Sequence, residues 1–187
     1  MTVLNDTIAP VTCEGSQYDE DSFLKRLLKG DGMYVDVGAS HPKECSNTWK
    51  LYQRGWRGLL IEPLPQCWYG LLRQRPGDYL MPVACGDKNG SAKLRAFHNV
   101  SSLRPDWPIT SQCDVTVDVM TLASILALFP EVRSKARLLS IDVEGFEKEV
   151  LQGNDWVAFK PQTIVLEYRF YDKDKPGKDR RPDSRHA

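Results

Sequence analysis

Three short apolar stretches of this chain each contain an acidic residue near their end: Asp36 in residues 33–41, Glu62 in residues 58–63 and Asp142 in residues 137–143. Short apolar runs rich in branched and aromatic side chains predict buried strands. In open α/β sheets, ligands bind at the carboxyl ends of the strands. Carboxylates there can accept hydrogen bonds from hydroxyl groups and pair with positive charges. We therefore expect a nucleotide-type cofactor site at these strand ends.

The loop after the first strand narrows the choice of cofactor. Gly38 is followed by Ala39 and Ser40, and small residues let a backbone approach a ligand closely. The dinucleotide fingerprint G-x-G-x-x-G requires two more glycines, but Ser40 and Lys43 occupy those positions. A P-loop Gly-Lys-Ser/Thr is also absent from the sequence. The loop disfavours NAD and favours an adenosine without a pyrophosphate, as in S-adenosylmethionine.

Glu62 has the type and place of a ribose-binding acid. It lies about two dozen residues after Gly38, roughly the spacing at which dinucleotide folds hold ribose hydroxyls. A carboxylate accepts two hydrogen bonds from a vicinal diol. The alternative is an ordinary surface acid at a strand end. The order of strand, loop, helix, strand and acid favours the ribose site.

The elements that would position these residues alternate between strands and helices. This alternation predicts βαβ units and a mainly parallel sheet with right-handed crossovers. Three further helices are expected: one from Ser16 with Phe23, Leu24, Leu27 and Leu28 on one face, one over 121–129 stopped by Pro130, and one from about Phe146. A third strand is expected over 79–85 at the sheet margin, and another over 163–168. A hairpin arm is expected after residue 90, and an extended piece over 115–119.

Length and composition predict one soluble globular domain. We expect a loose lead-in over 1–15, a domain over 16–171 and a disordered polar tail over 172–187. Lys+Arg and Asp+Glu both total 25, so no overall charge attracts nucleic acid or an anionic membrane. The N-terminus lacks the pattern of a secretory signal, and the five cysteines are scattered without metal-ligand spacing. We therefore expect a cytoplasmic protein with reduced thiols and no obligatory metal.

Several segments together resemble the FkbM family of S-adenosylmethionine-dependent methyltransferases. They cover most of the chain in the family's order: SQYDED, YVDVGASHP, SNTWKLYQRGWRGLLIEPLP, VACGD, SSL, TLASIL, LLSIDVEGFEKEVLQG and PQTIVLEY. The combination of IDVEGFE with GWRGLLIEP is specific. The resemblance implies a Rossmann-like class I methyltransferase fold, a three-layer α/β sandwich with a mainly parallel sheet. It also implies two further strands after Glu167, which this chain is expected to lack.

The same resemblance implies O-methylation of a hydroxyl on a sugar, glycan or secondary metabolite, with S-adenosylmethionine as donor. The implied site residues are Asp36, Gly38, Ala39 and Ser40 at the methionine end, Glu62 at the ribose with Pro63 beside it, Ala84 and Cys85 at the adenine, and Asp142 and Glu144 beside the reacting methyl. A hydroxyl nucleophile benefits from a base. Asp142, Glu144 or His98 can serve, although His98 is more simply a solvated hairpin residue.

Four further expectations remain open at this stage. His41 follows the glycine loop and either lines the acceptor pocket or packs on the N-terminal helix. Strand 163–168 would be an exposed edge, so we expect a homodimer to form through it. The rival from another class is a binding module, catalytically inactive or truncated, that acts with a partner. A second rival, an NAD-dependent oxidoreductase, lacks the required glycines.

Overall fold

The computed structural model describes residues 14–16, 20–96, 101–105 and 113–167. Its strands are β1 Met33–Val37, β2 Arg57–Ile61, β3 Tyr79–Met81, β4 Ala84–Gly86, β5 Gly90–Ala96, β6 Cys113–Thr121, β7 Ala136–Ile141 and β8 Thr163–Leu166. Its helices are α1 Glu20–Leu27, α2 Trp49–Gln53, α3 Pro65–Gln74, α4 Leu122–Leu128, α5 Pro130–Lys135 and α6 Glu147–Gln152. The predicted tail, His98 and most of the predicted lead-in lie outside the described residues.

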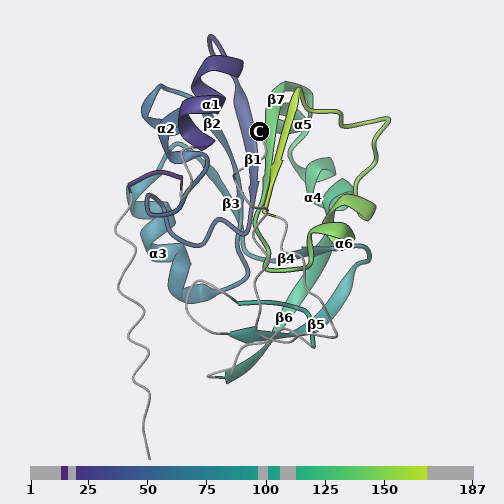
Figure 1. The fold of residues 1–187 in the computed structure, drawn as a ribbon. Coiled ribbons are helices and arrows are strands. Elements are labelled where there is room, and N and C mark those ends of the chain that lie inside the picture. Colours follow the sequence, from purple (N-terminus) through teal and green to yellow (C-terminus); the bar gives the residue numbers. More distant parts are fainter. Residues whose placement is uncertain (1–13, 17–19, 97–100, 106–112, 168–187) are drawn as a thin grey trace, which may run out of the picture.

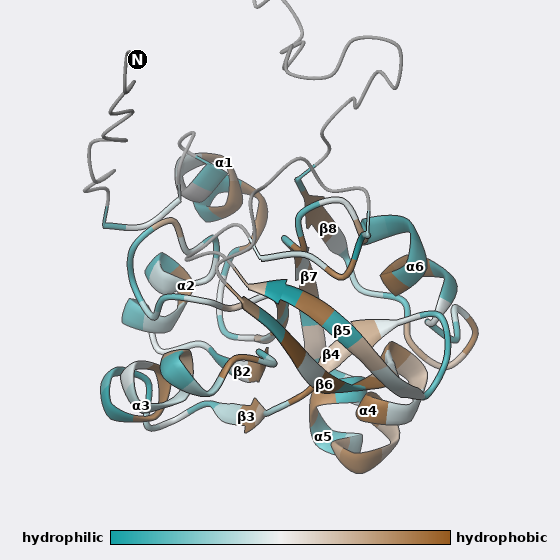
Figure 2. Ribbon diagram, turned by 90° about the horizontal axis from the view of Figure 1, so that it is seen from below, coloured by the Kyte–Doolittle hydropathy of each residue, from teal (hydrophilic) through white to brown (hydrophobic). Residues whose placement is uncertain are grey.

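The main sheet has five parallel strands in the order β3-β2-β1-β7-β8. Helices α1, α2 and α3 lie on one side of it, and α4, α5 and α6 lie on the other (Figure 2). Strands covered on both faces are mostly apolar, which explains the nearly continuous apolar runs in the sequence. The predicted Rossmann-like α/β fold with three layers is confirmed.

Each face of the main sheet carries its own apolar core. On the side of α4 and α5, Val35, Val37 and Ile141 pack with buried residues of those helices. On the opposite side, Tyr34 and Leu60 pack with residues of α1, α2 and α3. Adjacent residues of β1 therefore point to opposite cores, as the alternation of side chains along a strand requires.

The predicted third strand over 79–85 is wrong as one element. It divides at Pro82 into β3 and β4, which belong to different sheets. β3 pairs with β2 at the margin of the main sheet, as predicted for this segment, whereas β4 pairs with β6. Proline has no N–H to donate to a sheet ladder, so it suits the point where the chain changes sheets.

A second sheet has the order β4-β6-β5 and lies at the end toward which the strands of the main sheet run (Figure 1). β5 and β6 form the antiparallel hairpin that the alternating segment after residue 90 predicted. β6 is longer than the predicted extended piece over 115–119. This sheet therefore stands beside the expected cofactor site.

One helix prediction needs correction, and one helix was not predicted. Of the four apolar residues predicted for one face, Leu24 in α1 and Leu28 just after it are buried, whereas Phe23 and Leu27 are 56% and 43% exposed. The buried stripe is thus narrower than predicted, with one residue per turn. Pro130 ends α4 but also stands in the first turn of α5, a helix not predicted, because proline's missing N–H is tolerated there. No helix in the described residues has the length and hydropathy needed to cross a bilayer.

Candidate active site

The loops after β1, β2 and β7 meet at one edge of the main sheet. β1 lies between the other two strands and pairs with both in parallel. The backbone N–H of Gly38 donates to the carbonyl of Ile61 at 2.9 Å. On the other side, the N–H of Asp142 donates to the carbonyl of Val37 at 2.9 Å. The three predicted strand ends are therefore neighbours.

Gly38 allows the loops after β1 and β7 to touch. Its φ is +82°, in the left-handed region that favours glycine. A Cβ at this position would lie 1.8 Å from the carbonyl oxygen of Asp142. Ser40 also has a positive φ, of +42°. The sequence pattern of small residues thus corresponds to a tight loop pressed against the next strand end.

Glu62 joins the end of β2 to this loop. Its side chain is buried, and its Oε2 accepts a hydrogen bond from the Ser40 N–H at 2.9 Å. Its Oε1 accepts one from the Leu64 N–H at 2.9 Å. Burial raises the pKa of Glu62 to about 7, although the two backbone hydrogen bonds oppose the shift. Each oxygen retains a lone pair that can accept from a hydroxyl.

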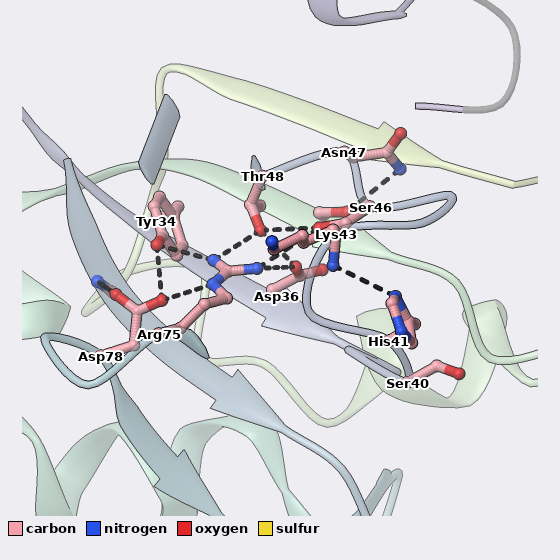
Figure 3. A network of polar contacts seen from close by, with 12 residues as sticks. Tyr34, Asp36, Ser40, His41, Lys43, Ser46, Asn47, Thr48, Arg75 and Asp78 are labelled. Atoms are coloured by element: carbon pink, nitrogen blue, oxygen red, sulfur yellow. Dashed lines mark hydrogen bonds and ion pairs between the residues drawn. The ribbon is translucent and has the colours of Figure 1, made fainter. Parts of the chain in front are cut away.

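Asp36 lies inside a buried polar network (Figure 3). Thr48 Oγ1 donates to its Oδ2 at 2.5 Å, and Arg75 Nη1 lies 3.9 Å from the same oxygen. Burial raises the pKa of Asp36, whereas Arg75 and the hydroxyls of Thr48 and Ser140 lower it. These contacts hold the carboxyl end of β1 to the segment before α2. The role of Asp36 at the methionine end of a cofactor stays a prediction.

Arg75 is the centre of that network. Its side chain is fully buried at the end of α3. Its Nε donates to Asp78 at 2.8 Å, and its Nη2 donates to Tyr34 Oη at 2.6 Å and to Thr48 Oγ1 at 2.9 Å. Asp78 Oδ1 in turn accepts from the N–H of Gly58 in β2. Sequence reasoning missed Arg75, because an arginine at a polar helix end gives no sign of burial.

The ends of β7 and β8 bring carboxylates together. One oxygen each of Asp142, Glu144 and Glu167 lie within 4.8 Å of one another. Burial is the largest cause that raises the pKa of Asp142 well above its ordinary range. The charge of Glu167 and a hydrogen bond with Glu167 also raise it. Glu144 and Glu147 raise that pKa further. Oxygen ligands of this kind suit a hard divalent cation or another positive group.

Glu167 is therefore a candidate site residue that the sequence predictions missed. It belongs to the expected strand over 163–168, but nothing in the sequence connected it with Asp142. Its backbone N–H donates to the Ile141 carbonyl at 3.1 Å, continuing the parallel pairing of β8 with β7. The pairing of β8 with β7 would have predicted it, because Asp142 and Glu167 each follow the last residue of one of these two strands.

Three further residues predicted for the site lie after β2 and in β4. Ala84 and Cys85 are buried in β4, and Pro63 is half-buried beside Glu62. Pro82 and Val83 connect β3 to β4, and the carbonyl of Met81 in β3 accepts from the Glu62 N–H at 3.1 Å. Burial raises the pKa of the Cys85 thiol to about 12, which keeps it protonated. Their contact with an adenine stays a prediction.

Two more side chains lie around the glycine loop. His41 is exposed, and its Nδ1 accepts from the N–H groups of Lys43 and Glu44 at 3.3 and 2.9 Å. Cys67 is half-buried next to Glu62 and Ser40, and burial together with the Glu62 charge raises the pKa of its thiol to about 12. Cys67 was not predicted, because scattered cysteines carry no spacing signal.

A comparison with protein families identifies the family of this chain. The model of the methyltransferase FkbM domain matches residues 36–181. The matched region contains β1 from Asp36 onward, the Glu62 strand end and the acidic residues after β7. The chain belongs to the FkbM methyltransferase domain family.

Comparisons with individual proteins give one similar solved structure. The crystal structure of methyltransferase FkbM from Methylobacillus flagellatus KT is similar to this chain, with 17% sequence identity and a TM-score of 0.45. The similarity covers 72% of this chain and 32% of that protein, so the chain spans about a third of its length. The search of curated proteins found no significant match.

Proposed function

We propose that this chain binds S-adenosylmethionine and transfers its methyl group to a hydroxyl oxygen. The observation that carries the proposal is the hydrogen bond from the Ser40 N–H to Glu62, which places a buried carboxylate against the glycine loop. The carboxylates after β7 lie at the same edge of the sheet. Family membership supports methyl transfer as the type of reaction.

The residues at this edge fit the chemical groups of S-adenosylmethionine. When bound, the cofactor supplies a methyl group on a positively charged sulfonium. Glu62 retains lone pairs for the ribose diol. The cluster of Asp142, Glu144 and Glu167 provides negative charge that favours a positive group. The missing fingerprint glycines agree with a cofactor that has no pyrophosphate.

In the proposed reaction, the chain's own groups position the reactants and take up a proton. The acceptor oxygen forms a bond to the methyl carbon as the carbon–sulfur bond breaks, and the sulfur leaves neutral. The hydroxyl proton passes to a carboxylate, for which Glu144 and Asp142 are the proposed bases. Holding the acceptor in line with the breaking bond supplies much of the rate. A sugar, glycan or secondary metabolite is the proposed acceptor class.

The thiols of the described residues support a reducing compartment. Cys45, Cys67, Cys85 and Cys113 form no disulfide within the described residues. Burial keeps Cys67 and Cys85 protonated, because it raises the pKa of each thiol to about 12. Free thiols are typical of proteins kept in reducing surroundings. We therefore propose a cytoplasmic enzyme.

Unfolding in urea with and without ligand tests the proposal. A ligand that binds only the folded state stabilises it by RT ln(1 + [L]/Kd), about 2.7 kcal/mol at a hundredfold excess over Kd. We expect S-adenosylhomocysteine to raise the unfolding midpoint and NAD to leave it unchanged. Stabilisation by NAD alone would contradict the proposal and favour the NAD-dependent alternative. Stabilisation by neither ligand would contradict the proposed cofactor.

A further inference from the structure

Ser102 is a buried serine that connects the second sheet to the acidic loop after β7. Its side chain is fully buried, and its Oγ donates to the backbone carbonyl of Glu144 at 2.7 Å. The same Oγ accepts from the Arg104 N–H at 3.1 Å. Backbone hydrogen bonds in both directions join Ser102 to Arg95 of β5, at 2.9 and 3.1 Å. The hydroxyl is thus anchored on one sheet and bonded to the loop of the other.

The loop that Ser102 contacts has an unfavourable backbone conformation. Glu144 has a φ of +53° and Gly145 has one of +92°. A left-handed glutamate needs support from its surroundings, because its Cβ crowds the following carbonyl. Glu147 Oε1 provides part of that support by accepting from the N–H groups of Gly145 at 2.9 Å and Val143 at 3.4 Å. Ser102 provides support from outside the loop.

The second sheet is packed closely enough to act as a support. A Cβ added to Gly153, at the end of α6, would lie 2.1 Å from the carbonyl oxygen of Gly86 in β4. A Cβ added to Gly86 would lie 3.3 Å from the Phe146 ring. The residues that follow Glu144 therefore press against β4. A closely packed sheet can hold Ser102 in place beside the loop.

We propose that Ser102 is a positioning residue, which holds the Glu144 carbonyl so that the carboxylates of Glu144 and Asp142 face a positively charged cofactor. This inference rests on the proposed function. Its consequence concerns charge: S-adenosylmethionine carries the sulfonium charge, whereas S-adenosylhomocysteine has a neutral sulfur. Carboxylates that face the sulfur favour the first over the second. Loss of the Ser102 hydroxyl should therefore reduce the ratio of the two affinities.

Calorimetric titration with both compounds tests this inference without a known acceptor. We expect Ser102→Ala to lower the affinity ratio of S-adenosylmethionine to S-adenosylhomocysteine about fivefold, with the second affinity nearly unchanged. Glu144→Gln should lower the ratio similarly, and adding Ser102→Ala to it should have little further effect. A merely structural role would weaken both ligands equally. Ser102→Cys, which keeps a weak donor at similar volume, should give an intermediate ratio and serves if the alanine variant does not fold.

Ser124→Ala is the matched control. Ser124 also lies next to the second sheet, where its Oγ contacts Asn89 and Thr121, but it does not belong to the acidic loop. The control should leave the affinity ratio unchanged. An unchanged ratio in a folded Ser102 variant, while the wild type binds both compounds, overturns the inference alone. Absence of binding to the wild type overturns the proposed function as well.

Discussion

Gly38 is the residue whose type is most strictly required by its surroundings. Replacing it with alanine adds the cost of a left-handed alanine, about 1–2 kcal/mol, to a collision with the Asp142 carbonyl. We expect Gly38→Ala to lower the free energy of unfolding by more than that and to abolish binding of S-adenosylhomocysteine. Urea denaturation and calorimetry measure the two effects.

Gly55→Ala separates strain from collision. Gly55 has a φ of +94°, but no heavy atom lies within 4 Å of an added Cβ. This variant should therefore show the backbone cost alone and retain ligand binding. Equal losses of stability in both variants would contradict the close contact between the two loops.

Glu62 should make cofactor binding depend on pH near neutrality. Because burial raises its pKa to about 7, the group changes charge between pH 6 and pH 8. The protonated form has less capacity to accept hydrogen bonds from a diol. We expect S-adenosylhomocysteine to bind about tenfold more weakly at pH 6 than at pH 8, measured by calorimetry.

The stability of the fold should respond to Glu62 in the opposite direction. The folded-state pKa lies above the ordinary value of 4.5, so this group's contribution to stability is present below pH 4.5 and is lost as the pH rises through about 7. Glu62→Gln should remove the pH dependence of ligand binding and of stability that Glu62 causes. Relative to the wild type, the free energy of unfolding of this variant should therefore be higher at pH 8 than at pH 5. A wild-type affinity that is constant from pH 6 to pH 8 would contradict the buried carboxylate.

At the scale of elements, Arg75 fastens α3 to β1 and to the segment before α2. Removing one partner of a buried ion pair costs about 3–5 kcal/mol, because the other charge stays buried. We expect Arg75→Met to lower the free energy of unfolding by about this amount. Arg75→Lys should recover only part of it, since lysine lacks the fork that reaches Asp78, Tyr34 and Thr48 together. Urea denaturation measures both variants.

Arg73→Met provides the comparison on the same helix. Arg73 is exposed and contacts the exposed Tyr69. Its replacement should change the free energy of unfolding by no more than about 0.5 kcal/mol. If both methionine variants lost the same small amount, the buried network would not hold these elements together.

The sequence predicted those elements whose signal is local. β1, β2 and β7 are continuous apolar runs, and each ends beside an acid, so both the strands and the edge they share could be predicted. The helix predicted over 121–129 from its apolar spacing and from Pro130 corresponds to α4, and Thr121 caps it by accepting from the Ser124 N–H at 3.1 Å. These features depend on neighbouring residues alone.

Features that depend on distant residues were missed or wrong. The chain changes sheets at Pro82 because β4 finds its partner in β6, more than thirty positions along the chain. Phe23 and Leu27 are exposed, although the sequence pattern places them on one face with the buried Leu24 and Leu28. Arg75 and Glu167 gain their importance from contacts with other strands and loops. Local patterning contains no record of such contacts.

At the scale of the whole molecule, β8 is the last strand of the main sheet among the described residues. Its Ile164 and Leu166 are 40% and 37% exposed. An exposed apolar edge is a template for pairing with another strand. We propose that two copies of the chain pair through it, and that Leu166→Lys weakens the pairing. Sedimentation velocity showing a monomer of the wild type at every concentration would contradict this proposal.

The arrangement of the two sheets defines the central claim. The main sheet supplies the three strand ends, and the second sheet stands across that edge and bonds to the acidic loop through Ser102. A cofactor site so formed needs the Glu62 strand end, the glycine loop and the acidic loop at once. Among these parts, Glu62 has the most specific proposed partner, the ribose diol.

Calorimetric titration of S-adenosylhomocysteine into the wild type and Glu62→Ala tests this claim most directly. Loss of hydrogen bonds to a charged acceptor costs about 1.5–3 kcal/mol, which corresponds to a tenfold to hundredfold loss of affinity. We expect the wild type to bind one equivalent and the folded variant to bind more weakly by that factor. No binding to the wild type, or equal binding to both proteins, would contradict the claim.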